Sequence, residues 1–230
     1  MDREELLETL AARGDFYHML STLYFREITQ DEIDAMAQRD FSQLRAGKDQ
    51  SIMAEGYDDM FRYLRKRNTG TRQELAADFT SAFLGTKTHE SKQAMPYESL
   101  FRDQSGLLMQ GPRNEVYQTF KQARVRIRQG LDVPDDHLSF ELEFMAILCE
   151  RAHDALADGK ERICANDLAT QKKFFDLHIA SWFEDFYELA MEITRTRFYH
   201  GVLKITKGFL ETEPYTIDEL LAGVSGQNAA

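Results

Sequence analysis

The chain has 230 residues, 43% of them hydrophobic, and carries 28 Lys and Arg against 39 Asp and Glu, a formal net charge of −11 at pH 7. This charge argues against binding to nucleic acid or anionic lipid and favours a basic or apolar partner. No uncharged run approaches the roughly 18 residues that a membrane-spanning helix needs, and the first five residues lack the basic-then-apolar layout of a signal peptide. We therefore expect a cytoplasmic protein without stable membrane insertion.

Apolar spacing is helical along nearly the whole chain, and proline occurs only 4 times. Strand-like alternation between tight turns is hard to find, so the sequence predicts an all-α protein. The expected helices cover residues 3–27, 30–45, 49–67, 72–84, 97–103, 112–129, 136–158, 166–180, 183–209 and 217–222.

Helix ends are marked by local signals. Three Thr and Glu pairs have the spacing of a capping box, in which side chain and backbone satisfy each other's donors at a helix start. Three glycines follow periodic segments and predict helix ends. These signals are Thr29 with Glu32, Thr71 with Glu74, Thr216 with Glu219, and Gly85, Gly130 and Gly159.

The length fits one globular, bundle-like domain of about ten helices. The helical pattern breaks at Gly130 to Pro134, which predicts an N-terminal half over about 1–129, a hinge at 130–135 and a C-terminal half over 136–222. The polar, small-residue tail at 223–230 is expected to be disordered.

A proline and two acids precede a strongly periodic apolar stretch at residues 138–156, which predicts a buried helix. Pro134, Asp135 and Asp136 are typical of a helix start, since proline lacks a donor that would stay unpaired and aspartate accepts free backbone N–H groups. The plainest interpretation is that Asp135 or Asp136 is the N-cap of this helix.

A cap accounts for one acid and leaves the second acid and His137 without a structural reason. This helix start is therefore a candidate binding site. Helical spacing puts Glu141 one turn beyond His137, where its carboxylate can reach the imidazole and favour the imidazolium. An imidazolium would compete with a cationic ligand for the neighbouring acids and weaken capture as it protonates.

Aromatic residues concentrate around the loop from Gly85 to Pro96. Phe79 precedes this loop, and Tyr97 and Phe101 follow it, one helical turn apart. The alternative to a binding role is that such rings belong to the core. The opening Pro96, Tyr97 and Glu98 after a polar loop is where a ring lines a groove instead, so partial exposure is expected.

A metal site is the alternative function. Glu150 and His153 have the Glu-x-x-His spacing of di-iron carboxylate bundles, and Asp15 and His18 are a near relative. A bundle of that kind needs further inward-pointing Glu residues, and acid and histidine pairs occur by chance in acidic helices. A third interpretation is a structural adaptor whose acidic motif only caps a helix.

The motifs together resemble the TorD/DmsD/NarJ family of molybdoenzyme maturation chaperones, nearer the TorD and DmsD branches. The resemblance covers most of the chain. It is carried by Asp78-Phe79, Phe83-Leu84-Gly85, Pro96-Tyr97-Glu98-Ser99, Asp136-His137-Leu138, Glu141-Leu142-Glu143-Phe144-Met145, Phe174-Phe175-Asp176-Leu177-His178-Ile179, Trp182 and Phe198-Tyr199.

This resemblance implies an all-helical cytoplasmic chaperone without catalytic activity or cofactor. Such a chaperone binds the twin-arginine signal peptide of an apo-molybdoenzyme and delays export until the molybdenum cofactor is inserted. Carried over by position, the family's peptide-binding region corresponds to Asp136, His137, Pro96 and Tyr97. Tyr97 stands where some members have a Trp, which leaves the anchor specificity open.

The chemistry of the peptide extends this set. A twin-arginine signal carries two guanidinium groups followed by an apolar stretch, so its receptor needs acids beside apolar surface. Asp135, Asp136, Glu141 and Glu98 are expected to meet the arginines. Phe79, Tyr97 and Phe101 are expected to hold the apolar segment. The sequence leaves open the client enzyme, a monomer or homodimer, and any binding of guanine nucleotide or molybdenum cofactor.

Overall fold

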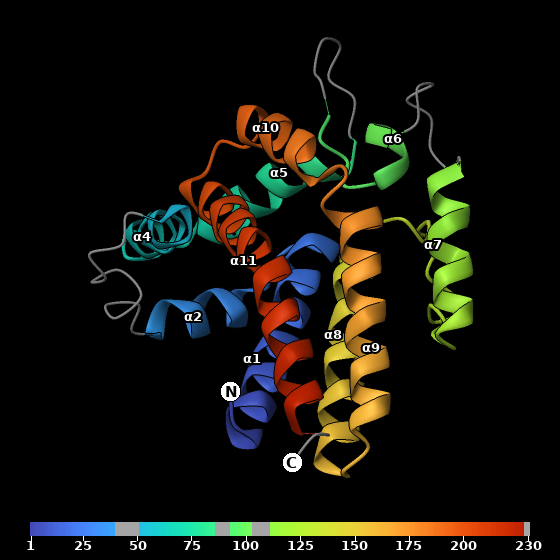
Figure 1. The fold of residues 1–230 in the computed structure, drawn as a ribbon. Helices are drawn as coiled ribbons and strands as arrows, with labels where there is room; N and C mark the ends of the chain where they lie inside the picture. Colours follow the sequence, from blue (N-terminus) through green and yellow to red (C-terminus); the bar gives the residue numbers. More distant parts are fainter. Residues whose placement is uncertain (40–50, 86–92, 103–110, 228–230) are drawn as a thin grey trace. The chain divides into compact units, whose positions relative to one another are not determined.

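A computed structural model describes residues 1–39, 51–85, 93–102 and 111–227, and within these ranges every regular element is a helix (Figure 1). The predicted all-α class is confirmed. The helices are α1 Arg3–Phe25, α2 Gln30–Gln38, α4 Ile52–Leu64, α5 Thr71–Phe83, α6 Glu98–Arg102, α7 Gly111–Gln122, α8 Leu138–Ala157, α9 Glu161–Phe174, the π-helix η1 Phe175–Ile179, α10 Phe183–Ile193 and α11 Arg197–Gln227.

The helices form two compact units that each draw on separate parts of the chain. Unit 1 comprises residues 1–22, 97–182 and 212–230, and unit 2 comprises residues 23–96 and 183–211. The segment 130–136, where a hinge is expected, lies wholly within unit 1. Both α1 and α11 contribute residues to each unit.

The core of unit 1 is aliphatic at one end and aromatic at the other. The first turns of α1 and the last turns of α11 pack with α8 and α9, which lie side by side in Figure 1. Phe144 of α8 contacts Phe120 of α7 and Phe174 of α9, with ring centroids 4.7 and 4.6 Å apart. Burial of such rings contributes roughly 1.5–3 kcal/mol each, so Phe144 joins three helices at the end of unit 1 that carries the site.

Unit 2 has an aromatic core. Phe83 of α5 contacts Tyr24, Phe186 and Tyr199 with ring centroids 5.7–6.1 Å apart, and Phe79 contacts Phe83 at 5.3 Å. All five side chains are almost fully buried. Edge-to-face pairs of this kind add to the free energy gained from area burial, so these rings fix α5, α10 and the first turns of α11.

Some of the predicted helix ends are confirmed. Thr29 and Glu32 form the reciprocal capping box at the start of α2. Gly85, Gly130 and Gly159 all have positive φ, at 68°, 92° and 72°, which glycine adopts without a Cβ penalty. Gly85 and Gly159 follow the ends of α5 and α8, as predicted. Gly130 does not end a helix: the predicted helix over 112–129 stops at Gln122, and Arg124 already has a positive φ of 57°.

Two predicted capping boxes are wrong. Thr71 lies one residue after the N-cap Gly70, and its hydroxyl accepts the N–H of Asn68. Thr216 lies inside α11 and donates to the carbonyl of Thr212. In both cases the Thr hydroxyl has a backbone partner on the N-terminal side, so spacing alone misplaces the cap.

The C-terminal helices are divided differently from the prediction. A single helix over 183–209 is wrong, because the chain leaves the helix at residues 194–196. The Asp78 carboxylate accepts the N–H groups of Arg195 and Thr196 at 2.8–3.1 Å, and the Thr196 hydroxyl accepts that of Tyr199. These bonds satisfy donors at a new helix start, so α10 ends and α11 begins.

The predicted short helix at 217–222 and the disordered tail from 223 are also wrong as far as Gln227. The helix α11 continues through Pro214 to Gln227, and residues 228–230 lie outside the described ranges. Leu220 and Val224 of this helix are fully buried in the aliphatic core of unit 1. This burial outweighs the cost of a proline inside a helix, about 3 kcal/mol.

Candidate functional site

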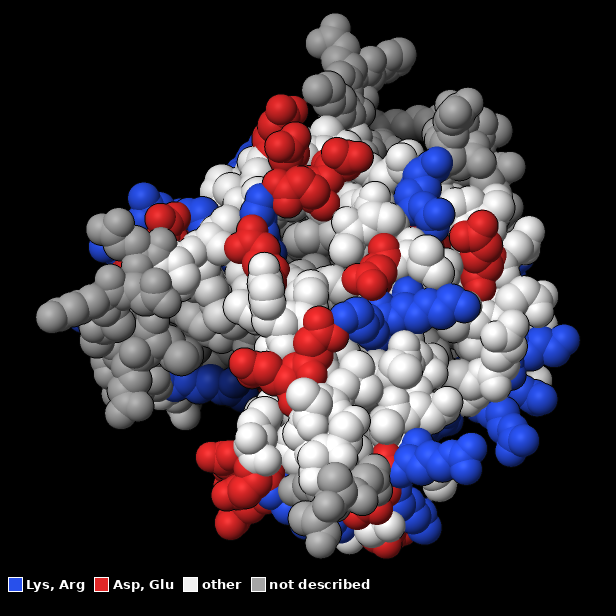
Figure 2. Space-filling view, in the orientation of Figure 1, with Lys and Arg blue, Asp and Glu red and all other residues white. Residues whose placement is uncertain are grey.

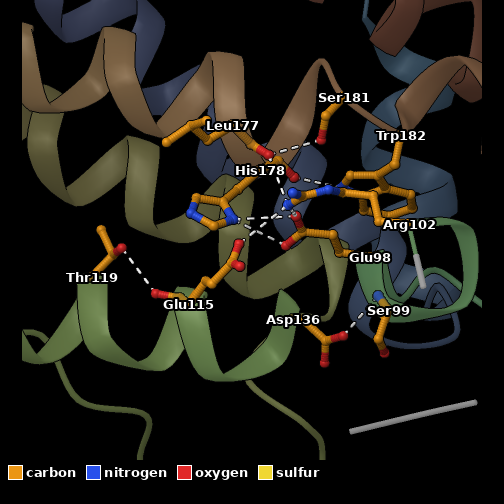
Figure 3. Close-up of polar contacts among 10 residues, drawn as sticks. All are labelled: Glu98, Ser99, Arg102, Glu115, Thr119, Asp136, Leu177, His178, Ser181 and Trp182. Carbon is orange, nitrogen blue, oxygen red and sulfur yellow. Dashed lines mark hydrogen bonds and ion pairs between the residues drawn. The ribbon is translucent and has the colours of Figure 1, made fainter. Parts of the chain in front are cut away.

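The site is built where two turns of unit 1 meet. Residue Tyr97, just before α6, pairs with His137, just before α8, through an isolated antiparallel bridge. The N–H of Glu98 donates to the carbonyl of Asp136 at 3.0 Å, and the N–H of Ser99 donates to the Asp136 carboxylate at 2.9 Å (Figure 3). Asp136 thus satisfies donors at the start of α6, and the bridge brings the two predicted site segments together.

Three carboxyl groups gather at this junction, and each is fully buried. We call Glu98, Asp136 and Glu141 the acid cluster. Among the described residues, oxygen Oδ1 of Asp136 has no hydrogen-bond partner, while Glu98 and Trp182 act on the Glu141 carboxyl. Buried polar groups are normally satisfied, so the acid cluster has more hydrogen-bonding capacity than the chain fills.

Burial and mutual repulsion control the ionisation of the acid cluster. The pKa of Glu141 lies well above its usual range, because burial disfavours the carboxylate and because the charges of Glu98 and Asp136 repel it. Burial likewise raises the pKa of Asp136, although the bonds from Ser99 oppose the effect. Neighbouring buried acids do not all ionise together, so Glu141 keeps its proton to a higher pH than an exposed glutamate does.

An arginine on α6 and a histidine on η1 lie beside Glu98 of the acid cluster (Figure 3). Ring nitrogen Nδ1 of His178 lies 3.1 and 3.2 Å from the carboxyl oxygens of Glu98. Arg102 contacts the Glu98 carboxylate, donates to the carbonyl of Leu177 at 3.1 Å and lies 3.6 Å from Glu115. Residues 177 and 178 belong to η1, and such π-turns are frequent at functional sites.

The remaining predicted acid, Asp135, is held by a second arginine. Atoms Nε and Nη2 of Arg113, on α7, both lie 2.8 Å from one oxygen of Asp135. The Asp135 side chain is 13% exposed and that of Arg113 is 36% exposed. The site therefore holds two guanidinium groups of the chain's own, each bound to a carboxylate.

His137, not Asp135 or Asp136, is the N-cap of α8, which corrects the prediction. Its Nδ1 accepts the N–H of Ser139 at 3.1 Å and lies 2.7 Å from the Ser139 hydroxyl. The predicted imidazolium is also wrong, because burial lowers the pKa of His137 from 6.5 to about 3. The neutral ring is the acceptor that a cap requires, and Asp136 caps α6 instead.

The predicted aromatic residues separate into two groups. Tyr97 and Phe101 are half-buried in unit 1. The Tyr97 ring meets His137 edge-on at 4.8 Å, and Phe101 stacks on Trp182 at 5.4 Å. Phe79 is 1% exposed in the core of unit 2. Its ring therefore has the core role that was the alternative to a binding role. Pro96 is buried at the edge of unit 2, next to Tyr97 in the chain.

The alternative metal site lacks inward-pointing ligands. The side chains of Asp15, His18 and Glu150 are exposed, and His153 is only half-buried beside the exposed Asp154. Within the described ranges no three metal-ligating side chains come together. Both acid and histidine pairs therefore lie on solvent-facing sides of their helices and do not form a metal site.

Several residues of the site were not predicted. Arg113 and His178 reach the acids from helices that the sequence does not connect to them, whereas Arg102 lies one turn beyond Glu98 on α6, a spacing that is visible in the sequence. His178 is buried and contacts Glu98, which lies 80 residues away in sequence. Only the Phe-Phe-Asp-Leu-His-Ile motif could have drawn attention to it.

Carboxylates that can pair with cations lie beside half-buried aromatic rings, an arrangement typical of a binding protein. Comparison with known proteins supports a binding role. Residues 46–188 match the nitrate reductase delta subunit family, and the chain belongs to that family. None of the described helices combines the length and apolar character that crossing a membrane requires.

The chain is similar to chaperones named TorD. It is 26% identical to chaperone protein TorD of Vibrio cholerae strain O395 over 91% of this chain and 93% of that protein. It is 28% identical to TorD of Vibrio vulnificus strain YJ016 over 86% and 90%, and 25% identical to TorD of Aliivibrio fischeri strain ES114 over 87% and 92%. The predicted resemblance is confirmed on the TorD side, and the chain is a chaperone rather than an enzyme.

Proposed function

We propose that this chain is a cytoplasmic, system-specific chaperone for a molybdenum-containing oxidoreductase. It binds the twin-arginine signal peptide and the apo form of its client, assists cofactor insertion and delays export. Family membership and the TorD relatives support the chaperone role. The junction of α6 and α8 supports the place of peptide binding.

The acid cluster is the observation that supports this place for peptide binding. Glu98, Asp136 and Glu141 are fully buried, and oxygen Oδ1 of Asp136 has no hydrogen-bond partner among the described residues. A guanidinium presents five N–H donors in a planar fork that suits carboxylates, whereas an ammonium presents a compact point charge. Such a site prefers arginine to lysine, which is the preference that a twin-arginine receptor needs.

Apolar surface lies beside the acids. Tyr97 and Phe101 are half-buried and follow Pro96 in the chain, and Phe140 of α8 is half-buried with its ring 6.0 Å from that of His137. Each apolar side chain that a peptide buries contributes roughly 1.5–3 kcal/mol, while ordering the peptide costs about 2–5 kcal/mol. Apolar contacts alone therefore give weak binding, and the arginines supply the specificity.

Calorimetric titration with synthetic peptides tests the proposal. One peptide carries Arg-Arg followed by an apolar stretch, and the second carries Lys-Lys in its place. We expect the Arg-Arg peptide to bind on the order of 10-fold or more tightly, since a hydrogen bond to a charged group contributes about 1.5–3 kcal/mol. Equal affinities would contradict guanidinium recognition.

A matched pair of variants locates the binding. Asp135→Asn removes a carboxylate at the site, and Asp34→Asn removes one that pairs with Arg67 in unit 2. Both change the net charge equally. We expect only Asp135→Asn to weaken Arg-Arg peptide binding, and an equal effect of the two variants would contradict the assignment of the site.

The oligomeric state is a separate part of the proposal. Exchange of helical halves about residues 130–135 would give a homodimer, and a chain that keeps its own halves would be a monomer. Light scattering during size-exclusion chromatography distinguishes the two by mass. A change of mass on lengthening the 130–133 segment supports exchange, and an unchanged monomer mass rejects it.

A further inference from the structure

Two arginines of the chain already occupy the carboxylates that the proposed function assigns to the signal peptide. Arg102 reaches acceptors on three elements, namely Glu98 on α6, the Leu177 carbonyl on η1 and Glu115 on α7. An ordinary ion pair within one helix uses a single carboxylate. Acceptors converging from three elements form a guanidinium-binding subsite.

The second subsite is at Asp135. Two nitrogens of Arg113 bind its carboxylate, and Asp135 precedes Asp136, whose carbonyl accepts the N–H of Glu98. The two subsites are therefore joined through Asp136. One guanidinium held at the acid cluster and one held at the neighbouring Asp135 match the number that a twin-arginine peptide brings.

The two arginines are more exposed than the acids beneath them. The side chains of Arg102 and Arg113 are 28% and 36% exposed, while those of Glu98 and Asp135 are 0% and 13% exposed. A partly exposed guanidinium leaves its partner at little cost, because water receives it. A buried carboxylate left unpaired is costly, so one guanidinium must replace another.

We propose that Arg102 and Arg113 are internal stand-ins for the peptide's arginines, which displace them on binding. The inference rests on the proposed function and adds its regulation. While no client is present, the stand-ins keep the acids paired and exclude weaker cations. On the face drawn in Figure 2, Lys and Arg side chains over α7 and α9 alternate with Asp and Glu side chains.

This exchange sets a threshold for ligands. A lysine ammonium cannot reproduce the planar contacts of the guanidinium that it would replace, so it competes poorly with the stand-ins. An apolar segment that follows the peptide's arginines provides the extra affinity needed to displace them. Removing a stand-in should therefore tighten binding and also reduce the preference for Arg-Arg over Lys-Lys.

The test is calorimetric titration of Arg113→Gln and Arg102→Gln with both peptides. We expect binding of the Arg-Arg peptide to tighten roughly 2- to 5-fold for Arg113→Gln, as the 0.2–1 kcal/mol of a partly exposed pair implies, and at least as much for Arg102→Gln. We expect Lys-Lys peptide binding to tighten more. The control is Arg26→Gln, which breaks the Arg26–Glu32 pair of unit 2 with the same change of net charge.

The displacement of Arg102 and Arg113 is rejected if both variants bind the Arg-Arg peptide as well as or more weakly than the wild type does. If the wild type still prefers the Arg-Arg peptide, the proposed function stands. Loss of that preference in the wild type would reject the proposed function itself. An NMR titration of wild-type arginine side-chain N–H signals is independent of variant folding. We expect the peptide to shift the Arg102 and Arg113 signals toward those of solvated arginine, and unmoved signals would overturn the exchange.

Discussion

Unit 1 contains two clusters in which arginine meets buried carboxylate, and they differ in access to solvent. In the first, Arg13 binds Glu213 through two nitrogens, and the hydroxyl of Tyr17 donates to the same carboxylate at 2.5 Å. The Arg13 and Glu213 side chains are 5% and 1% exposed. In the second, buried Glu98 meets Arg102, which is 28% exposed.

The comparison separates a structural ion pair from an exchangeable one. Arg13 also donates to Gln171 at 2.9 Å, so the pair links α1, α9 and α11 inside unit 1. If either charged side chain moved into solvent, its partner would remain buried and unpaired. This cluster therefore stabilises the fold and does not exchange partners. At the acid cluster the guanidinium can enter water while another takes its place, so the same chemistry becomes a binding site.

The largest effect is expected from breaking the buried Arg13–Glu213 pair. Glu213→Ala leaves the Arg13 charge buried and unpaired, and we expect a loss of about 3–5 kcal/mol in the free energy of unfolding. Urea denaturation followed by circular dichroism measures it. Peptide affinity of the folded fraction should be unchanged. A loss below about 1 kcal/mol would show that this cluster is not the structural one.

A smaller, pH-dependent effect is expected from Glu141→Gln. The raised pKa of Glu141 means that the folded state keeps a proton above the ordinary value of 4.5, where the unfolded state releases it. Wild-type stability is then lost as pH rises through this window. The glutamine variant cannot ionise, so we expect it to match the wild type near pH 4 and to exceed it increasingly toward pH 8.

Denaturation curves of wild type and Glu141→Gln across that range measure the difference, at about 1.4 kcal/mol for each unit of pKa shift. Glu219→Gln, on an exposed position of α11, is the matched control. A difference between wild type and Glu141→Gln that does not change with pH would contradict burial of a protonated carboxyl in the acid cluster.

His137 should affect stability through its cap and through acid titration. We expect His137→Ala to cost about 1 kcal/mol, the usual loss when an N-cap acceptor is removed, and His137→Asn to restore most of it. Because the folded pKa is lowered from 6.5 to about 3, the wild type loses stability as pH falls through that window. His137→Asn should lose less over the same range, and parallel pH curves would contradict the neutral buried ring.

The sequence predicts the helical class and the two segments of the site, because both depend on local signals. Apolar periodicity defines α8, and the resemblance selects Tyr97 and His137, which the fold brings into contact. The partners of the acids depend on tertiary packing instead. Helical spacing places Arg102 one turn beyond Glu98, but His178 reaches Glu98 only after α6 and η1 have packed, and no spacing in the chain encodes that contact.

The errors have the same origin. His137 was predicted to titrate because Glu141 lies one turn away, but a buried ring responds to desolvation before it responds to helical spacing. Phe79 is predicted to hold the apolar part of the peptide because it flanks the aromatic-rich loop, but it packs against Phe83 and Tyr199 in unit 2. Burial is a property of the packed units, so local pattern could not supply either answer.

The smallest effect is expected from an exposed pair. Arg26→Gln breaks its contacts with Glu32, whose side chain is 34% exposed, and surface pairs contribute at most about 1 kcal/mol. We expect the free energy of unfolding to change by less than that and the peptide affinity not to change. If Arg26→Gln lowered the free energy of unfolding as much as Glu213→Ala does, the distinction between buried and exposed ion pairs would be wrong.

The most direct test of the central claim is a double-mutant cycle between the acid cluster and the peptide. Glu98→Gln and wild type are each titrated with the Arg-Arg peptide and with peptides in which one arginine is replaced by glutamine. We predict a coupling of at least about 1 kcal/mol between Glu98 and one of the two arginines, as close charge pairs across an interface show. Additive effects at both arginines would mean that the peptide does not reach the acid cluster.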